Sequence, residues 1–327
     1  MPYSPPIRLE LPTLFGMKSV NAYLFVEPEP VLIDCGEKTP QNIQAIRDGL
    51  AKEGLEIGDL EKIIITHAHV DHMGAAATLA KESGAKVYLP RYAWPWAVDL
   101  VAMRESRIEL IKENLNLYGA GLDSVVQQTF ARIFQAFGTA WEEIPEKYLM
   151  SYEEGDILEL GGNAWQVLYT PGHCINQCCF YQAEAQHLIS SDMLLSITPS
   201  PVIDPSLEDP SKRVKGLLQM LDSYKRLKTL EIQEVFPGHY ESFYHAHDTI
   251  RQQEKRIHRR KLECLSIIDT GILDPHEIFR QMYGKNVIGW SMMVGYLDLL
   301  EDEGYINLRE KNSKLQIFRN RFKQELN

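Results

Sequence analysis

The sequence lacks the features that mark membrane, secreted or disulfide-stabilised proteins. Its 327 residues contain no apolar run that approaches the roughly 20 residues of a membrane span. The N-terminal stretch has neither the basic segment nor the apolar core of a secretory signal. The five cysteines form no Cys-x-x-Cys pair. We therefore expect a globular, cytoplasmic protein with reduced thiols and no membrane partner.

Positive charge is scarce in most of the chain. The formal net charge is −11, and it is unevenly spread. Residues 1–250 hold 20 Lys+Arg against 34 Asp+Glu, whereas residues 251–327 hold 14 against 11. An acidic body repels a long polyanion, although bound cations would offset part of that charge. Nucleic acid is therefore disfavoured as a substrate but not excluded.

One short stretch carries four residues of metal-ligand type. The apolar residues 63–65 predict a buried strand, and His67, His69, Asp71 and His72 follow it. The first two histidines are two apart and would face the same way on an extended turn. Imidazole and carboxylate groups suit a borderline metal such as zinc. The alternative is a polar helix cap, but a cap needs one acceptor rather than four such residues.

The segment T-H-A-H-V-D-H at 66–72 resembles the H-x-H-x-D-H motif of metallo-β-lactamase fold hydrolases. The resemblance implies an α/β fold, an αββα sandwich of two mixed sheets, with a two-metal site at one edge. It also implies later ligands in the order His, Asp, His. His173, Asp192 and His239 match that order, because each ends an apolar strand and a Pro-Gly turn precedes both histidines. Ser191 stands where many relatives have glycine.

The resemblance implies two divalent metal ions, zinc first, with iron or manganese as alternatives. The implied ligands are two triads and a bridge: His67, His69 and His173, then Asp71, His72 and His239, and finally Asp192. Such a pair of ions lowers the pKa of a shared water and so provides a bridging hydroxide near neutral pH. Catalytic roles would fall to Asp192, as the bridge, and to Asp71, which can orient the water or carry a proton.

Asp34 and Cys174 lie near the predicted ligands in the sequence. Asp34 ends the strand predicted at 31–34 and precedes Gly36. The resemblance implies that Asp34 supports the metal site without binding metal, and a plain turn residue is an equal alternative. Cys174 is next to His173, and we interpret it as a small core residue rather than a ligand.

The stretch from about 92 to 148 is long and helical in period. We interpret it as a helical insertion that roofs the metal crevice, with plain packing on the outer sheet face as the alternative. Its aromatic content also suggests a homodimer. The apolar residues that carry this pattern are Trp94, Trp96, Leu100, Met103, Ile108, Ile111, Val125, Phe130, Ile133, Phe134, Phe137 and Trp141.

Past His239 the pattern changes, and we place a domain boundary between 1–248 and 249–327. Three predicted helices and a hairpin give the order of a winged-helix module: 249–268, 275–283, 290–303, then 305–308 with 315–318. The first helix carries a basic run at Arg256, Arg259, Arg260 and Lys261. The third carries Asp298 and Glu301, which would repel phosphate. We therefore weigh a packing or substrate-covering module above a DNA reader, although the predicted wing is basic.

The reaction chemistry is better constrained than the substrate. The acidic body and the aromatic roof favour a hydrolase of a small ester, thioester or lactone, as in the glyoxalase-II-like and lactonase-like branches of this family. The sequence has no obvious basic cluster beside Asp192 for a glutathione carboxylate, which counts against glyoxalase II itself. The alternative is a metal-dependent ribonuclease or phosphodiesterase aided by the C-terminal module. A non-catalytic binding protein ranks last, because all seven ligand positions are filled.

Overall fold

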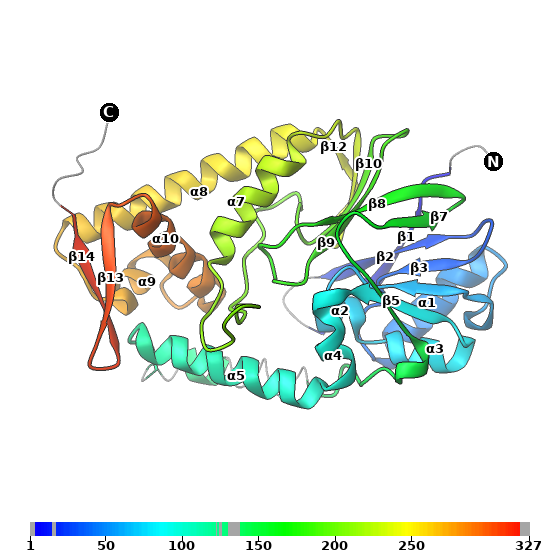
Figure 1. Ribbon diagram of the computed structural model, residues 1–327, viewed down its shortest axis with the longest axis horizontal. Coiled ribbons are helices and arrows are strands. Elements are labelled where there is room, and N and C mark those ends of the chain that lie inside the picture. The colour runs from blue at the N-terminus through cyan, green and yellow to red at the C-terminus, as the bar shows by residue number, and fades with distance from the viewer. Residues whose placement is uncertain (1–3, 15–17, 122, 124–125, 130–137, 321–327) are drawn as a thin grey trace.

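The computed structural model describes residues 4–14, 18–121, 123, 126–129 and 138–320. Two six-stranded sheets lie face to face, with helices on both outer faces (Figure 1). This arrangement confirms the predicted αββα sandwich. Among the described residues, no helix is both long and apolar enough to cross a membrane.

The first sheet is built from β1 (Ile7–Pro12), β2 (Ser19–Phe25), β3 (Val31–Ile33), β4 (Lys62–Ile64), β5 (Lys86–Pro90) and β6 (Leu149–Tyr152). The first three strands pair antiparallel, and β3 to β6 pair parallel. Parallel neighbours need crossover connections. Helix α1 (Pro40–Lys52) supplies one after β3, and the short α2 (Val70–Met73) with α3 (Ala76–Ser83) supplies the next after β4.

The second sheet contains β7 (Ile157–Leu160), β8 (Asn163–Tyr169), β9 (Cys178–Gln182), β10 (His187–Ser191), β11 (Glu234–Pro237) and β12 (Phe243–Tyr244). Only β10 and β11 pair parallel, and α7 (Gly216–Leu227) lies between them in the chain. The strands that precede His173, Asp192 and His239 are β8, β10 and β11. They end at the same edge of the sandwich as β4.

Alternate side chains of the strands enter different cores. Ile33 of β3 and Ile64 of β4 lie between the sheets, where they share a buried cluster with Trp165. Their neighbours Leu32 and Ile63 point outward into the cluster that α1 and α3 cover. Because both faces are buried, these strands are continuously apolar rather than alternating, which is the pattern that predicted them.

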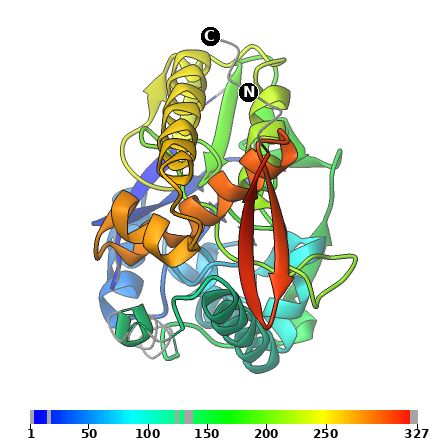
Figure 2. The same ribbon diagram turned by 90° about the vertical axis from the view of Figure 1, so that its left-hand side faces the viewer.

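Two further helical segments lie beside the sheets. Helices α4 (Trp94–Val98) and α5 (Leu100–Leu117) follow β5. The C-terminal segment contains α8 (Ala246–Asp269), α9 (Pro275–Tyr283), α10 (Trp290–Asp302) and the hairpin of β13 (Ile306–Lys311) with β14 (Lys314–Arg319). Helix α5 runs from the sheets toward β14 in Figure 1, and in Figure 2 the C-terminal helices and hairpin face the viewer.

The C-terminal helices share one apolar core with the rest of the chain. Tyr224 of α7, Ile257 of α8 and Leu300 of α10 belong to the same buried cluster as Leu188 of β10. Helix α8 begins at Ala246, so the boundary predicted after residue 248 falls inside a helix. The division into two domains and the winged-helix assignment stay predictions. The shared core indicates that the C-terminal segment packs against the second sheet and α7 and is not connected to them by a linker alone.

Five of the apolar residues that predicted the helical insertion lie outside the described residues, namely Val125, Phe130, Ile133, Phe134 and Phe137.

Candidate metal centre

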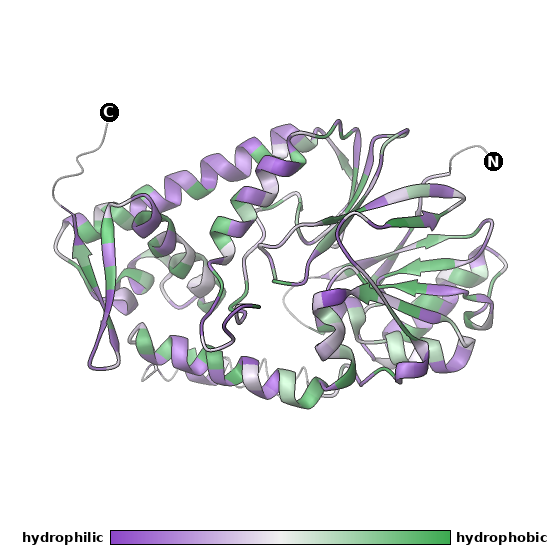
Figure 3. Cartoon of the chain, in the orientation of Figure 1, coloured by the Kyte–Doolittle hydropathy of each residue, from purple (hydrophilic) through white to green (hydrophobic). Residues whose placement is uncertain are grey.

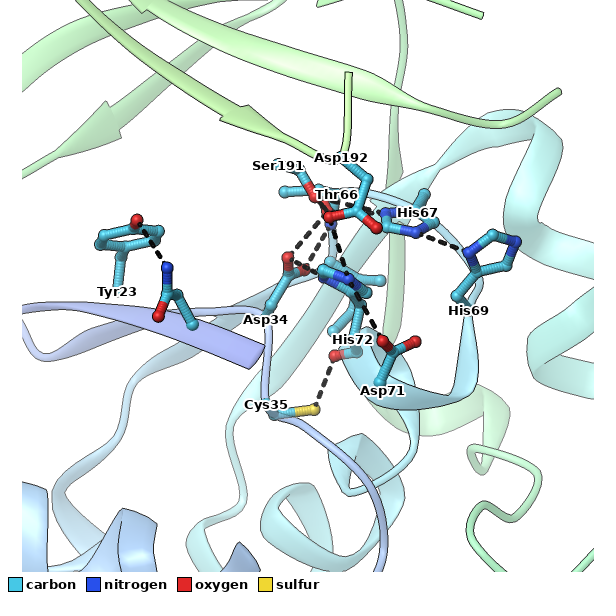
Figure 4. Close-up of polar contacts among 12 residues, drawn as sticks. Tyr23, Asp34, Cys35, Thr66, His67, His69, Asp71, His72, Ser191 and Asp192 are labelled. Carbon is cyan, nitrogen blue, oxygen red and sulfur yellow. Dashed lines mark hydrogen bonds and ion pairs between the residues drawn. The ribbon is translucent and has the colours of Figure 1, made fainter. Parts of the chain in front are cut away.

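The predicted ligands meet at one edge of the sandwich, where strand ends from both sheets converge. His67 and His69 follow β4, with His69 at the N-cap of α2, and Asp71 and His72 lie within that short helix. In Figure 4 these four side chains and that of Asp192 surround a common centre. His173, Asp192 and His239 follow β8, β10 and β11 respectively.

The glycines of the two Pro-Gly-His turns permit a close approach to their neighbours. A Cβ atom on Gly238 would lie 2.2 Å from Asp192 Oδ1 and 2.9 Å from the ring of His72. A Cβ atom on Gly172 would lie 2.5 Å from Cα of Met220. All three distances are shorter than a side chain tolerates, so these turns need glycine in order to bring their histidines into the site.

Three histidines form the first ligand group. Nε2 of His67 and Nε2 of His173 each lie 3.0 Å from Nδ1 of His69. Ring nitrogens at this separation repel one another if all carry lone pairs, unless a proton or a cation lies among them. The set therefore has the convergence that a bound cation requires.

Asp71, His72 and His239 form the second group, whose ligand atoms all lie within 4.8 Å of one another. Asp192 contacts both groups. Its Oδ1 lies 3.5 Å from Nε2 of His72, and its Oδ2 lies 3.5 Å from Nε2 of His173 and 3.4 Å from that of His239. This is the position that a bridging carboxylate would occupy.

Hydrogen bonds hold the outer nitrogen of three ligand histidines. Nδ1 of His72 lies 2.7 Å from Asp34 Oδ2, Nδ1 of His173 lies 2.9 Å from the carbonyl of Ser200, and Nδ1 of His239 lies 2.7 Å from the carbonyl of Ser19. An Nδ1–H that donates outward leaves the Nε2 lone pair directed at the centre. Such bonds fix both the tautomer and the orientation of a metal-binding imidazole.

Asp34 combines the two roles that the sequence left open. Its backbone has a positive φ of 55°, as in a turn. Its carboxylate also accepts hydrogen bonds from the backbone N–H and the hydroxyl of Thr66, both at 2.8 Å, besides the one from His72. Ser191 has a φ of 45°, which accounts for a preference for glycine there, and its hydroxyl lies 2.7 Å from that of Thr66.

The charges of the site fit divalent cations. The side chains of Asp71 and Asp192 are only 25% and 7% exposed, and neither pairs with a lysine or arginine among the described residues. Nε2 of His72 and Oδ1 of Asp192 are buried without a hydrogen-bond partner. Buried polar atoms of this kind normally have a partner. The donor set, five imidazoles and two carboxylates, suits a pair of zinc-like ions.

The pKa values of these groups point the same way. Burial, together with the neighbouring histidines, lowers the pKa of His67 and of His69 well below the usual value, so both offer neutral rings. Burial raises the pKa of Asp192, but His239 and His72 lower it further, and the carboxylate stays ionised. Burial also lowers the pKa of His239, but the nearby Asp192 raises it to about 10. The negative charge that draws a proton to His239 would equally draw a metal ion.

Cys174 lies close to the first group without having the form of a ligand. Its sulfur is within 4.8 Å of the ligand atoms of His67 and His69. Burial, and then Asp204, raise the pKa of the thiol well above its usual value. The thiol donates a hydrogen bond to Asn176 Oδ1 at 3.5 Å. The geometry is that of the buried core residue we expected.

Two arginines of α5 belong to the site, and the sequence reasoning missed them. Arg107 pairs with the buried Asp204 at 3.1 Å, lies over the ring of Trp96, and brings Nη2 to 3.5 Å from Nε2 of His69. Arg104 lies one turn earlier and lines the same cavity. The available signal was two arginines three residues apart on a helix face that also carries Ile108 and Ile111.

Five of the seven predicted ligands line a cavity of about 490 Å³, which we call the chamber. Its other walls come from four separate segments: residues 96–111 at the start of the predicted insertion, Trp141 near its end, residues 195–203, and residues 287–291 before and within α10. The chamber is mostly apolar, and its apolar lining includes Trp96, Ile108, Ile111, Trp141, Leu195, Ile197, Ile203, Val287 and Trp290.

Comparisons with known proteins extend these observations. The family model described as Metallo-beta-lactamase superfamily matches residues 16–239. The probable metallo-hydrolase YqjP of Bacillus subtilis is 26% identical over 305 residues, which cover 91% of this chain and 92% of that protein. Hydroxyacylglutathione hydrolase GloC of Haemophilus influenzae is 24% identical over 168 residues, a match that covers 51% of this chain and 62% of that protein. The crystal structure of a metallo-beta-lactamase family protein from Thermus thermophilus is 22% identical, with a TM-score of 0.79, and the match covers 96% of this chain and 98% of that one.

Proposed function

The chain belongs to the metallo-beta-lactamase superfamily and is a metal-dependent hydrolase, and we propose that it uses two zinc ions to cleave small carboxylic esters, thioesters or lactones. The observation that carries this substrate class is the apolar chamber over the ligands. Apolar walls favour the carbon skeleton of an acyl group. A phosphodiester strand would instead need cations along its path.

Two divalent ions held by these ligands would lower the pKa of a water between them and polarise the carbonyl oxygen of the substrate. The histidine triad would hold one ion, and Asp71, His72 and His239 the other. Asp192 would contact both ions, because it touches members of both groups. The hydrogen bonds from Asp34 and from the carbonyls of Ser19 and Ser200 would keep the imidazoles in place.

Asp71 is the carboxylate best placed to move a proton. Its side chain is 25% exposed and lines the chamber, whereas that of Asp192 is 7% exposed and sits between the ligand groups. Asp71 Oδ2 would accept a proton from the attacking water and return it to the leaving oxygen or sulfur. Trp96 and Trp141, on the chamber wall, would cover the acyl group.

One panel of substrates tests this proposal. Metal-loaded protein would be assayed with 4-nitrophenyl butyrate, a butyryl thioester, a γ-lactone, bis(4-nitrophenyl) phosphate and a short RNA. We expect turnover of acyl substrates that a chelator abolishes and zinc restores. Activity should rise with acyl length until the chamber is full, and Trp141→Ala should move that optimum to longer chains.

The same panel separates the alternative function. Cleavage of the phosphodiester or the RNA, with no turnover of any acyl substrate, would overturn the proposal and favour a metal-dependent nuclease. Asp71→Asn serves as the matched control for background hydrolysis, because it removes the proton acceptor while keeping the side-chain shape.

A further inference from the structure

A second recess adjoins the chamber and is lined by three arginines of α8. It has a volume of about 310 Å³, and Arg256, Arg259 and Arg260 contribute to its wall with Thr198 and Ser200. Among the residues that the structure describes, no aspartate or glutamate lines it. These arginines belong to the basic run of the sequence, which has no role in the proposed hydrolytic reaction.

Among the described residues, α8 neutralises only one of the three arginines that line this recess. Of its four carboxylates, Glu263 pairs with Arg260, whereas the other three pair with cations outside the recess: Asp248 with Arg251, Glu254 with Lys228, and Asp269 with Arg319. Arg256 and Arg259 have no carboxylate within ion-pair distance in the part of the chain that the structure describes. Both are exposed on a helix that is hydrophilic over most of its length (Figure 3). In a protein of net charge −11, this is a local site of attraction for anions.

Arg260 is held in place and forms a fixed part of the wall. Its Nη1 lies 2.6 Å from Glu263, and its Nη2 donates to the carbonyl of Met282 at 3.0 Å. Its guanidinium lies over the ring of Tyr283 at 4.7 Å. The unpaired guanidinium groups of Arg256 and Arg259 thus lie beside the ordered guanidinium group of Arg260, where a ligand can contact all three.

The recess and the chamber adjoin each other along the segment of residues 198–200. Thr198, Ser200 and Ile288 line both of them. The carbonyl of Ser200 also accepts the hydrogen bond from His173 Nδ1 at 2.9 Å. A molecule whose reacting carbonyl lies at the ligands could therefore extend past this segment and place a charged end in the recess.

We propose that the recess binds phosphate groups on the leaving part of the substrate, which is then a thioester of a phosphate-bearing carrier with its acyl group in the chamber. This inference rests on the proposed hydrolase function. Several guanidinium groups suit a multiply charged phosphate, whose oxygens accept paired N–H bonds, better than a single carboxylate. In the reaction, the water oxygen bonds to the carbonyl carbon, the carbon–sulfur bond breaks, and the carrier leaves as a thiol with the proton that Asp71 returns.

Two thioesters with the same acyl group test the proposal. Butyryl-coenzyme A carries phosphates, and butyryl-N-acetylcysteamine carries none. For the double variant Arg256→Gln/Arg259→Gln, we expect KM for the coenzyme A thioester to rise about 10- to 100-fold, with kcat little changed. The N-acetylcysteamine thioester should be unaffected. The control is Arg251→Gln, which removes a paired arginine of the same helix outside the recess and should change neither substrate.

A binding measurement keeps the test independent of turnover. Adenosine 3′,5′-bisphosphate lacks both the acyl group and the thiol, and calorimetry would measure its Kd. The double variant should weaken this binding, and added salt should weaken it in the wild type. If no acyl substrate is hydrolysed but binding still depends on the two arginines, the proposed acyl-substrate function fails and the anion site stands.

Three results would overturn the inference. The first is an equal rise in KM for both thioesters in the double variant. The second is a nucleotide Kd that the double variant leaves unchanged. The third is arginine-dependent binding of a short single-stranded RNA without binding of the nucleotide, which would assign the recess to a phosphodiester backbone.

Discussion

Replacement of Asp34 by asparagine should weaken the binding of one metal ion more than that of the other. Asp34 Oδ2 accepts hydrogen bonds from His72 Nδ1 at 2.7 Å and from the hydroxyl of Thr66 at 2.8 Å, while Oδ1 accepts from the backbone N–H of Thr66. The asparagine oxygen can keep the backbone bond. Its NH₂ group would then face the N–H of His72, and two donors cannot bond to each other. His72 would have to turn or move its proton to Nε2, the atom that should hold the ion.

The size of this effect follows from the position of Asp34. Loss of a partner that orients a ligand typically lowers metal affinity about 10- to 100-fold, or about 1.4–2.7 kcal/mol. That loss should fall on the ion held with Asp71 and His239. The histidine triad should lose less, because Asp34 reaches it only through Thr66, whose hydroxyl lies 3.1 Å from His67 Nδ1.

A stepwise competition with a chromophoric chelator, with the metal content determined by mass spectrometry, would measure both affinities. We expect one ion to keep its wild-type affinity and the other to leave early. The matched control is Asp298→Asn, which removes another buried carboxylate that pairs with Arg213 at 2.6 Å. It should lower the unfolding free energy without changing either metal affinity. Unchanged affinities in Asp34→Asn, or equal losses at both ions, would refute the reasoning.

The remaining predictions concern the bridge, the pH dependence and the C-terminal segment. Asp192→Ala should abolish turnover and lower the metal content below about two ions per chain, with an unchanged far-ultraviolet circular dichroism spectrum; retained activity would remove Asp192 from its role. The pKa of His239 is raised to about 10, so in metal-stripped protein the stability that it contributes is complete below its unfolded pKa and is lost as pH rises through about 10. Metal-loaded protein should not show this decline, because the neutral ring binds the ion. The free energy of unfolding would be measured by urea titration at several pH values, and the same pH dependence in both forms would contradict this. Removal of residues 246–327 should expose Leu217 and Tyr224, which lie in the shared core, and so increase binding of a hydrophobic dye; a soluble, fully active truncation would show an independent module.

Several boundaries show where local patterns are sufficient and where they are not. Local signals are sufficient to place the start of α1, because the Thr39 side chain accepts a hydrogen bond from Asn42 N and Pro40 is the first helical residue. The sequence pattern places the start of α8 too late. The predicted helix begins at residue 249, whereas α8 begins at Ala246, and Asp248 lies in its first turn, where a carboxylate suits the helix dipole. The true N-cap is His245, in a left-handed conformation.

The sequence by itself predicted the candidate ligand set and the kind of chemistry, through one motif and the family resemblance that it carries. The occurrence of ligand-type side chains directly after apolar strands is a local property, which can be recognised without knowing how the two sheets pack. The sequence also showed the basic run of α8, but not what the run faces.

Only the tertiary structure decided the form of the substrate site. The chamber joins walls from α5, residues 195–203 and α10, and the recess joins α8 to residues 198–200. The pairing of Arg107 with Asp204 likewise spans 97 residues. Such neighbours are set by how whole helices pack on the sheets, and helix packing depends on side-chain volumes across distant segments rather than on any local period.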